Sequence, residues 1–394
     1  MKQTVCLISF SPIAYDARVL RQIKFLLPHY DLIVLGYGDP PALLAPHPGV
    51  RWISIAQPNW RPLRRLANLG LFLRMGHYWS TFYYLWHMSL NSARDAQRKA
   101  GKLRCDVVHA NEWEALPLAA DLAQRNNCPL VFDAHEYSPL QFTTGSLASR
   151  LFAPAISYIL HTYGPQVTAS TTVCEPLAER YRTEFQLDPM VVMNAPEYRE
   201  VEGADHPVDP ERVRLIHHGA AMRGRCLETM IEIIALCDHR FSLDFMLIGN
   251  PAYVVELTKL AQEIAPNRVR FLNPVQPHQI QKTIMKYDLG FCYIYPSNYS
   301  YLVSLPNKFF DFIHAGLAVC IGPSPSMVAL GQQYGFTVVA PSFAAKDVAV
   351  TLNALDAERI TVLRRAARQA AAQLNAEVEL TKLVQIYQRL LSHG

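Results

Sequence analysis

The chain has 394 residues, 50% of them hydrophobic and 18% charged, and its formal net charge is +4 with histidine neutral. This composition excludes a disordered chain and predicts a soluble globular protein of two domains, while the mild charge gives no reason to expect nucleic acid as a partner. The eight cysteines are scattered without a Cys-x-x-Cys pair, so we expect reduced thiols and a cytoplasmic location.

Short apolar segments alternate with helical patterns in the first half of the chain. The N-terminus is too short and too strand-like for a signal peptide, and no uncharged apolar segment is long enough to span a membrane. A helix is expected at Ala17–Leu27, and buried strands are expected at Val5–Phe10, Leu32–Leu35, Val50–Ile55, Val107–Ala110 and Leu130–Phe132.

The first expected helix begins with charged residues directly after a strand. Asp16 suits a helix N-terminus, whereas Arg18 opposes the helix dipole there and requires a carboxylate or another anion as its partner. A helix cap with an ordinary surface salt bridge explains the same residues, and the sequence leaves both interpretations open.

Residues Arg61–His87 combine four arginines with many leucine and aromatic residues. A basic, aromatic-rich helical region can lie on an anionic membrane surface, which would place the protein on the inner face of the cell membrane. The alternative is a buried helical hairpin that covers one face of a sheet, because large aromatic side chains are most often buried.

Polar side chains gather at the ends of the fourth and fifth expected strands. His109 and Glu112 lie at the end of the fourth strand, and Asp133, His135 and Glu136 follow the fifth. Acidic neighbours of this kind orient an imidazole and shift its proton affinity, which indicates a functional site. A structural histidine is the simpler alternative.

The second half of the chain repeats the alternation after Ala195–Glu211, a proline-rich and charged linker candidate. This alternation predicts an α/β fold of doubly wound domains, whose ligands bind in a cleft at the carboxyl ends of the strands. The expected strands are Val213–His217, Leu243–Ile248, Val269–Leu272, Leu289–Ile294 and Leu317–Ile321, and the expected helices include Glu228–Cys237 and an uninterrupted helical region, Glu358–Leu391.

Two segments of the second half suit a nucleotide. The loop with Gly219, Arg223 and Arg225 offers backbone amides and guanidinium groups to a diphosphate, although its spacing matches neither a Walker loop nor a dinucleotide fingerprint. In Ser304–Gly316, Lys308 at a helix N-terminus suits an anion and Asp311 suits sugar or ribose hydroxyls. A capped amphipathic helix with a surface lysine is the alternative for this segment.

Other chemistries find no support in the sequence. It contains no His-Glu-x-x-His, no Asp-x-Asp pair and no Gly-x-Ser-x-Gly motif. We therefore expect neither a catalytic metal nor another cofactor.

Several segments match one known family in order and spacing: Asp16–Val19, Asp106–His109, Asp133–Glu136, Val192–Pro196, His218–Gly219, Arg225–Glu228, Leu305–Asp311 and Ala315–Gly316. Together they resemble the GT-B glycosyltransferases of the large retaining family 4. The resemblance implies two Rossmann-like domains, 1–196 and 197–374, that face a central cleft. It also implies that the C-terminal helix, within 375–394, crosses back to the first domain.

The resemblance assigns roles to residues of both domains. His135 is similar to the family histidine that contacts the donor sugar, and Arg225 to the residue that neutralises the diphosphate. Asp311 is similar to the family glutamate that holds the ribose. Lys308 is expected to share the catalytic role with His135 and Arg225, and Gly219 and Asn307 to complete the donor site. The candidate acceptor-binding residues are Asp16, Arg18, His109, Glu112 and Glu136.

Three positions depart from the family pattern. Val303 stands where the family has its first glutamate, Ala220 stands where a second basic residue is usual, and Asp311 is one methylene shorter than glutamate. We expect Lys308 to supply the charge missing at Ala220, with Arg223 as the weaker candidate.

The expected function is transfer of a sugar, with retention, from a nucleotide-diphosphate sugar to a saccharide or lipid-linked acceptor in surface polysaccharide or glycolipid biosynthesis. Attack on the same face as departure is favoured, because no convincing carboxylate nucleophile is visible. The alternatives are a GT-B nucleotide-sugar epimerase and a catalytically silent nucleotide-sugar-binding or partner subunit.

Overall fold

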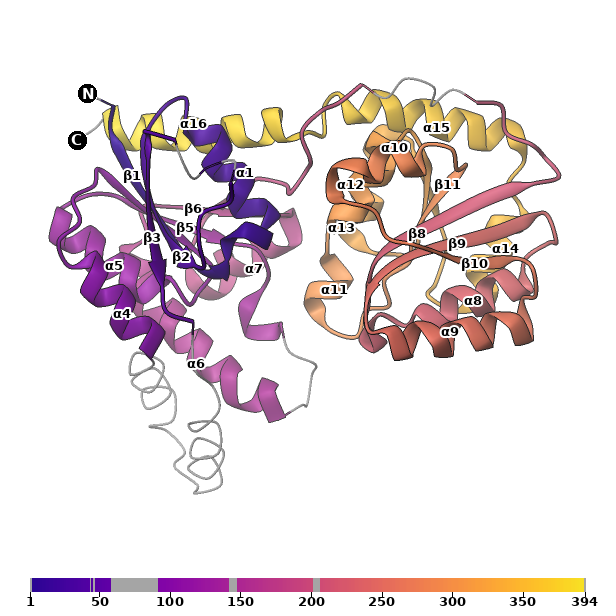
Figure 1. Cartoon of the computed structure of the whole chain (residues 1–394), viewed down its shortest axis with the longest axis horizontal. Coiled ribbons are helices and arrows are strands. Elements are labelled where there is room, and N and C mark those ends of the chain that lie inside the picture. Colours follow the sequence, from indigo (N-terminus) through magenta and orange to yellow (C-terminus); the bar gives the residue numbers. More distant parts are fainter. Residues whose placement is uncertain are drawn as a thin grey trace. The chain divides into compact units, whose positions relative to one another are not determined.

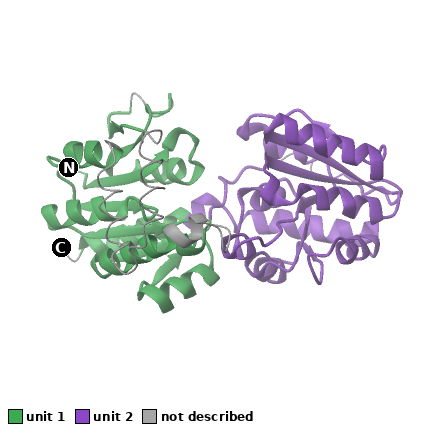
Figure 2. Ribbon diagram, turned by 90° about the horizontal axis from the view of Figure 1, so that it is seen from below, with its two compact units in different colours: residues 1–193, 380–394 green, residues 194–379 purple. Residues whose placement is uncertain are grey.

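The computed structural model describes residues 2–42, 44, 47–57, 91–141, 147–200 and 206–392. The chain forms two compact units: unit 1 consists of Met1–Met193 with Leu380–Gly394, and unit 2 of Asn194–Glu379 (Figure 2). The boundaries expected at 196/197 and 374/375 lie a few residues from these breaks. The possible membrane-facing segment Arg61–His87 lies outside the described residues, and its interpretation stays a prediction.

Unit 1 is built on a parallel seven-stranded sheet in the order β3-β2-β1-β4-β5-β6-β7 (Figure 1). Its strands are β1 (Thr4–Pro12), β2 (Asp31–Tyr37), β3 (Val50–Ile55), β4 (Val107–Asn111), β5 (Leu130–Ala134), β6 (Ala169–Thr172) and β7 (Pro189–Val191). Its helices are α1 (Ala17–Leu26), α4 (Asn91–Ala100), α5 (Leu116–Asn126), α6 (Leu147–Tyr163), α7 (Glu175–Phe185) and most of α16 (Ala376–Ser392).

The strand order of unit 1 reverses between β1 and β4, and open α/β sheets bind ligands beside such a reversal. The register pairs Ser9 with Asn111 and Asn111 with Asp133. The carboxyl ends of β1, β4 and β5 therefore lie side by side, which brings the polar residues that follow them to one edge of the sheet.

Unit 2 repeats this architecture with a parallel six-stranded sheet in the order β10-β9-β8-β11-β12-β13. Its strands are β8 (Val213–Ala221), β9 (Phe241–Gly249), β10 (Val269–Leu272), β11 (Leu289–Cys292), β12 (Ala318–Ile321) and β13 (Thr337–Val339). Its helices are α8 (Leu227–Leu236), α9 (Pro251–Ile264), α10 (Ile280–Ile284), α11 (Tyr299–Val303), α12 (Asn307–His314), α13 (Pro325–Tyr334), α14 (Ala345–Asn353) and α15 (Ala357–Ala371).

Alternating residues of β11 show how the sheet of unit 2 buries both faces. Leu289 and Phe291 pack in the core that contains α8 and α9, whereas Gly290 faces Phe312 of α12 on the other side (Figure 1). A side chain at Gly290 would collide with the Phe312 ring, so glycine lets α12 approach the sheet closely. This packing fixes the helix that carries Lys308 and Asp311.

The expected α/β fold of two doubly wound domains is confirmed, but the uninterrupted helix expected over Glu358–Leu391 is wrong. The helix breaks between α15 and α16, and Asn375 explains the break. Its side-chain amide donates to the carbonyls of Ala371 and Ala372 at the end of α15, and its Oδ1 accepts from the Val378 N–H at the start of α16. One side chain therefore caps two helices.

No helix in the described ranges is both long and apolar enough to cross a membrane.

Candidate functional site

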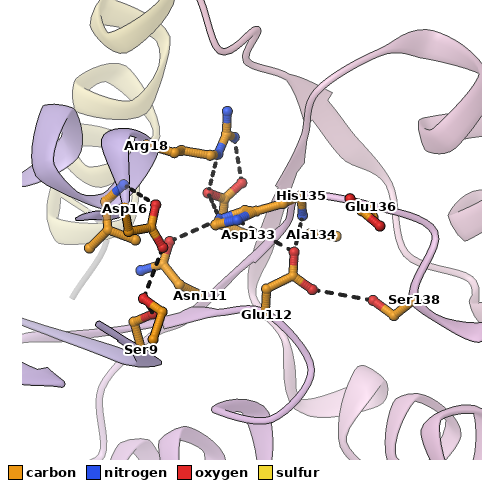
Figure 3. Close-up of polar contacts among 12 residues, drawn as sticks. Ser9, Asp16, Arg18, Asn111, Glu112, Asp133, Ala134, His135, Glu136 and Ser138 are labelled. Atoms are coloured by element: carbon orange, nitrogen blue, oxygen red, sulfur yellow. Dashed lines mark hydrogen bonds and ion pairs between the residues drawn. The ribbon is translucent and has the colours of Figure 1, made fainter. Parts of the chain in front are cut away.

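A buried carboxylate, Asp133 at the end of β5, organises the polar cluster of unit 1 (Figure 3). The Arg18 guanidinium donates to both of its oxygens, at 2.7 and 2.6 Å, and its remaining nitrogen donates to the Val192 carbonyl. Gln22 and Thr171 also donate to Asp133, each at 2.6 Å. Burial disfavours the charged form, but Arg18 leads the interactions that outweigh burial and hold the pKa of Asp133 well below its ordinary value.

His135 lies between two carboxylates, as the sequence predicted. Its Nε2 is 3.1 Å from Asp133 Oδ2 and 3.3 Å from Asn111 Oδ1, and its Nδ1 is 3.4 Å from Glu112 Oε1 (Figure 3). Burial opposes charging the ring, but Asp133 and Glu112 outweigh it and raise the pKa of His135. An imidazolium donates from both nitrogens and therefore suits this pair of acceptors.

Glu112 takes a backbone conformation that is rare for a residue with a side chain, with φ at +66°. In this conformation its Oε1 accepts from the His135 backbone N–H at 2.8 Å, and its Oε2 accepts from the Ser138 hydroxyl at 3.4 Å. Burial raises the pKa of Glu112 to about 7. Residues held in such conformations cluster at functional sites, so this geometry supports the site at β4 and β5.

The other candidate acceptor residues take different positions in unit 1. Asp16 caps α1 by accepting from the Val19 N–H, and it also accepts from the Ser11 hydroxyl at 2.9 Å. His109 is fully buried, and its Nδ1 forms a hydrogen bond with the Tyr387 hydroxyl of α16. Burial lowers the pKa of His109 to about 4, so the ring is neutral at pH 7.

Glu136, another candidate acceptor residue, lies on the loop after β5 (Figure 3). Arg18 is buried, with only 5% of its surface exposed. The carboxylate partner that the sequence required for Arg18 is Asp133. Because the guanidinium donates to Asp133 and Val192, Arg18 holds the buried Asp133 carboxylate in place and does not offer its charge at the surface.

In unit 2, the candidate donor residues gather where β8 ends and α12 begins. Gly219 has φ at +133°, and a Cβ built there would lie 3.1 Å from Lys308 Nζ and 4.0 Å from an Arg225 nitrogen. Two basic side chains therefore lie beside a glycine backbone. Lys308 is 5% exposed and lies in the first turn of α12, where the helix dipole adds a third positive contribution.

Asp311 and Asn307 extend this cluster along α12. Asp311 Oδ2 is 3.5 Å from His218 Nε2, and 18% of its side chain is exposed. Asn307 is exposed, and its Oδ1 accepts from the Asn194 amide at 2.9 Å. Both residues thus lie in unit 2 beside Lys308, as a donor site would require.

The departures from the family pattern also have structural counterparts. Val303 is buried in the core with 2% exposure, as its apolar side chain requires. Arg223 donates to both oxygens of Glu256 at 2.7 Å and stacks on the Tyr253 ring. Arg223 therefore already has a carboxylate partner, and the expectation that Lys308 supplies the charge missing at Ala220 stays a prediction.

Sequence reasoning missed several residues of these clusters. Gln22 lies one turn after Arg18 on the same face of α1, and that spacing was the available signal. Thr171 belongs to β6, which was not recognised as a strand, and His217 was read as an ordinary strand residue.

The comparisons with known proteins agree with this architecture. Residues 18–196 match the family model described as a glycosyl transferase 4-like domain. No curated protein matches the sequence.

Three similar solved structures come from different enzymes or complexes. Sucrose-phosphate synthase from Thermosynechococcus elongatus has a TM-score of 0.72 and 14% identity, with 100% of each chain covered. Trehalose 6-phosphate synthase from Burkholderia multivorans has a TM-score of 0.69 and 10% identity, also with 100% of each covered. Anabaena Alr3699/HepE in complex with UDP-glucose has a TM-score of 0.67 and 14% identity, with 98% of this chain and 100% of that chain covered.

At these identities the similarity to solved structures establishes the fold, while the family model identifies the domain. The chain therefore has the GT-B fold, and its residues 18–196 match a glycosyl transferase 4-like domain.

Proposed function

We propose that the protein is a retaining glycosyltransferase that moves a sugar from a nucleoside-diphosphate sugar to a saccharide or lipid-linked acceptor. The proposed setting is the cytoplasmic side of the cell membrane, in the synthesis of a surface polysaccharide or glycolipid. The donor belongs to unit 2 and the acceptor to unit 1.

The observation that carries the proposal is the pair of basic side chains beside Gly219. Lys308 is buried next to Arg225, and the charge of Arg225 acts on it more strongly than that of Asp311. Two neighbouring cations at a helix N-terminus are costly without an anion, and a diphosphate supplies negative charge for both. Asp311, one turn along α12 from Lys308, is then the candidate ligand of the ribose hydroxyls.

The same cations account for the chemistry of the leaving group. Negative charge develops on the departing nucleoside diphosphate, and preorganised cations stabilise it most where water is excluded. Arg225, Lys308 and the N-terminus of α12 would fill this role without a metal ion. Activity that persists in excess chelator is the expected result.

The environment of Asp133 supports attack from the face of departure rather than double displacement at this residue. Asp133 is fully buried, and hydrogen bonds from Arg18, Gln22, Thr171 and His135 engage its oxygens. A nucleophile must reach the anomeric carbon, which this carboxylate does not. The diphosphate itself would then help to accept the proton of the acceptor.

His135 is proposed to contact the donor sugar as a cation. Its side chain keeps 19% exposure, and two carboxylates favour its charged form. Loss of one preorganised charged group near a reacting centre typically costs about 100- to 1000-fold in kcat. We expect His135→Ala to show a loss in this range with little change in nucleotide binding.

A thermal-shift screen against UDP-, GDP- and dTDP-sugars tests the donor site. Binding at 100 times the Kd stabilises a protein by about 2.7 kcal/mol, so the right nucleotide raises the melting temperature by several degrees. Lys308→Ala should abolish most of this shift, whereas Lys346→Ala, which removes an exposed lysine of α14, should retain it. An undiminished shift in Lys308→Ala would show that Lys308 does not bind the donor.

The products distinguish the transferase from its alternatives. Release of free sugar or transfer to an acceptor supports a transferase, and epimerised donor in the absence of an acceptor would indicate an epimerase. The composition of Arg61–His87 supports a contact with anionic membranes, and sedimentation with liposomes that depends on anionic lipid is the expected result.

A further inference from the structure

A histidine inside β8 holds the Lys308 amine. His217 Nδ1 lies 2.8 Å from the Phe291 carbonyl, which can only accept, so Nδ1 carries the proton. His217 Nε2 lies 3.0 Å from Lys308 Nζ and must therefore accept from the lysine. Burial, reinforced by Lys308, lowers the pKa of His217 well below its ordinary value and keeps the ring neutral.

The groups around Lys308 in unit 2 come from four elements. They are His217 and His218 of β8, Arg225 of the turn Arg223–Arg225, Cys292 of β11, and Asp311 of α12. Burial and Lys308 lower the pKa of His218 to about 3, and burial raises the pKa of Cys292 to about 12, so both are neutral near pH 7.

Lys308 differs from these neighbours because its charge changes close to neutral pH. Burial is the largest cause and the Arg225 guanidinium the next, and together they lower the pKa of Lys308 to about 7. In an empty site above this pH, the amine is mostly neutral. A diphosphate beside Nζ would favour the ammonium form, because an anion at hydrogen-bond distance stabilises the charged state.

We propose that His217 is a positioning residue of the donor site, which aims the Lys308 amine at the bound diphosphate and so couples diphosphate binding to uptake of one proton by Lys308. The inference rests on the proposed function, because it needs a diphosphate in this site. The proton comes from solvent, an N–H bond forms at Nζ, and no other bond changes. His217 stays neutral throughout, because burial and Lys308 hold its pKa well below the ordinary value.

The sign of the pH dependence follows from this coupling. The bound state holds one more proton than the free state above the pKa of free Lys308, so affinity falls as pH rises. The expected loss is about tenfold for each pH unit from about pH 7.5, until the pKa of bound Lys308 is reached.

Isothermal titration calorimetry at pH 8 measures the proton directly. UDP, GDP and dTDP are titrated separately in two buffers of different ionisation enthalpy, and the difference in heat gives the protons taken up. At pH 8 the terminal phosphate of these nucleotides is almost fully ionised, because its pKa is about 6, so uptake reports on the protein. We expect about 0.9 proton per nucleotide bound.

Three variants separate positioning from a merely structural role. Lys308→Arg keeps a permanent charge, so it should bind nucleotide with no proton uptake and a flat pH profile above pH 7. His217→Leu should weaken binding about tenfold or more, because the hydrogen bond that orients the amine is lost. His217→Gln, whose amide oxygen accepts from Lys308, should restore much of the affinity.

The outcomes distinguish this inference from the function on which it rests. If the wild type binds a nucleotide with no proton uptake and no pH dependence, the inference is overturned and the donor site stands. If none of the three nucleotides binds, both are overturned. Unchanged affinity in a folded His217→Leu variant would show that His217 does not position Lys308.

Discussion

Replacing Asp133 by asparagine should destabilise unit 1 strongly, because it leaves the charge of Arg18 buried without a partner. The side chains of Arg18 and Asp133 are 6% and 0% exposed, and two parallel hydrogen bonds join them. Removing one member of such a buried pair typically costs about 3 to 5 kcal/mol. For a unit of this size, that corresponds to a fall in melting temperature of about 6 to 20 °C.

A double-mutant cycle isolates the interaction from other effects of the substitution. Arg18→Met and Asp133→Asn together remove both charges, so the double variant should be at least about 2 kcal/mol more stable than the sum of the single effects predicts. Urea unfolding followed by circular dichroism gives the four free energies. Glu179→Gln, which breaks the exposed pair with Arg182, is the control and should cost less than about 1 kcal/mol.

The pH dependence provides a second check on the same pair. The folded pKa of Asp133 is depressed, so its contribution to stability is present above about pH 4 and is lost as pH falls further. The stability difference between wild type and Asp133→Asn should shrink correspondingly in acid. Strict additivity in the cycle, with a difference independent of pH, would refute the view that this ion pair organises the site.

Three further predictions follow from individual residues. Gly290→Ala would place a Cβ 2.2 Å from the Phe312 ring, and we expect urea unfolding to show a loss of about 1 to 3 kcal/mol. Gly219→Ala combines an unfavourable φ of +133° with a contact to Lys308 Nζ, so calorimetry should show weaker nucleotide binding. Burial raises the pKa of Glu112 from 4.5 to about 7, so this residue costs stability progressively as pH rises between these values. Glu112→Gln should therefore gain about 1 to 3 kcal/mol in urea unfolding at pH 8 and little at pH 4.

The parts of the fold that were predictable are those in which burial leaves a continuous pattern in the sequence. Val50–Ile55 and Val269–Leu272 were predicted with the bounds that the structure shows, because apolar or β-branched residues and flanking turns mark both ends. The missing strands β6, β7 and β13 are short, and β6 reads Ala-Ser-Thr-Thr. Their pairing comes from neighbouring strands, which a local pattern does not contain.

The site was predictable where the charge of a residue and its position in an expected helix or strand indicate the kind of partner it needs. An arginine at the start of a helix required an anion, and Asp133 fulfils that requirement from more than 100 residues away. The sequence could not show that this partnership buries Arg18, nor that Thr171 and Gln22 complete the hydrogen bonds of Asp133. Those facts depend on the strand order, which places β6 beside β5, and on the packing of α1 against the end of β5.

The polar cluster of unit 1 and the basic cluster of unit 2 differ in how completely their charges are compensated. This difference suggests that the two clusters have different roles. In unit 1, Asp133 meets Arg18 and His135 meets two carboxylates, so the geometry is already set before any ligand arrives. In unit 2, Lys308 and Arg225 lie together beside Gly219, and burial leaves the lysine partly uncharged. A preorganised centre suits catalysis, because its dipoles need no rearrangement in the transition state. A centre that gains its full charge only with an anion suits binding. Nucleotide should therefore stabilise unit 2 and leave the charge state of His135 nearly unchanged.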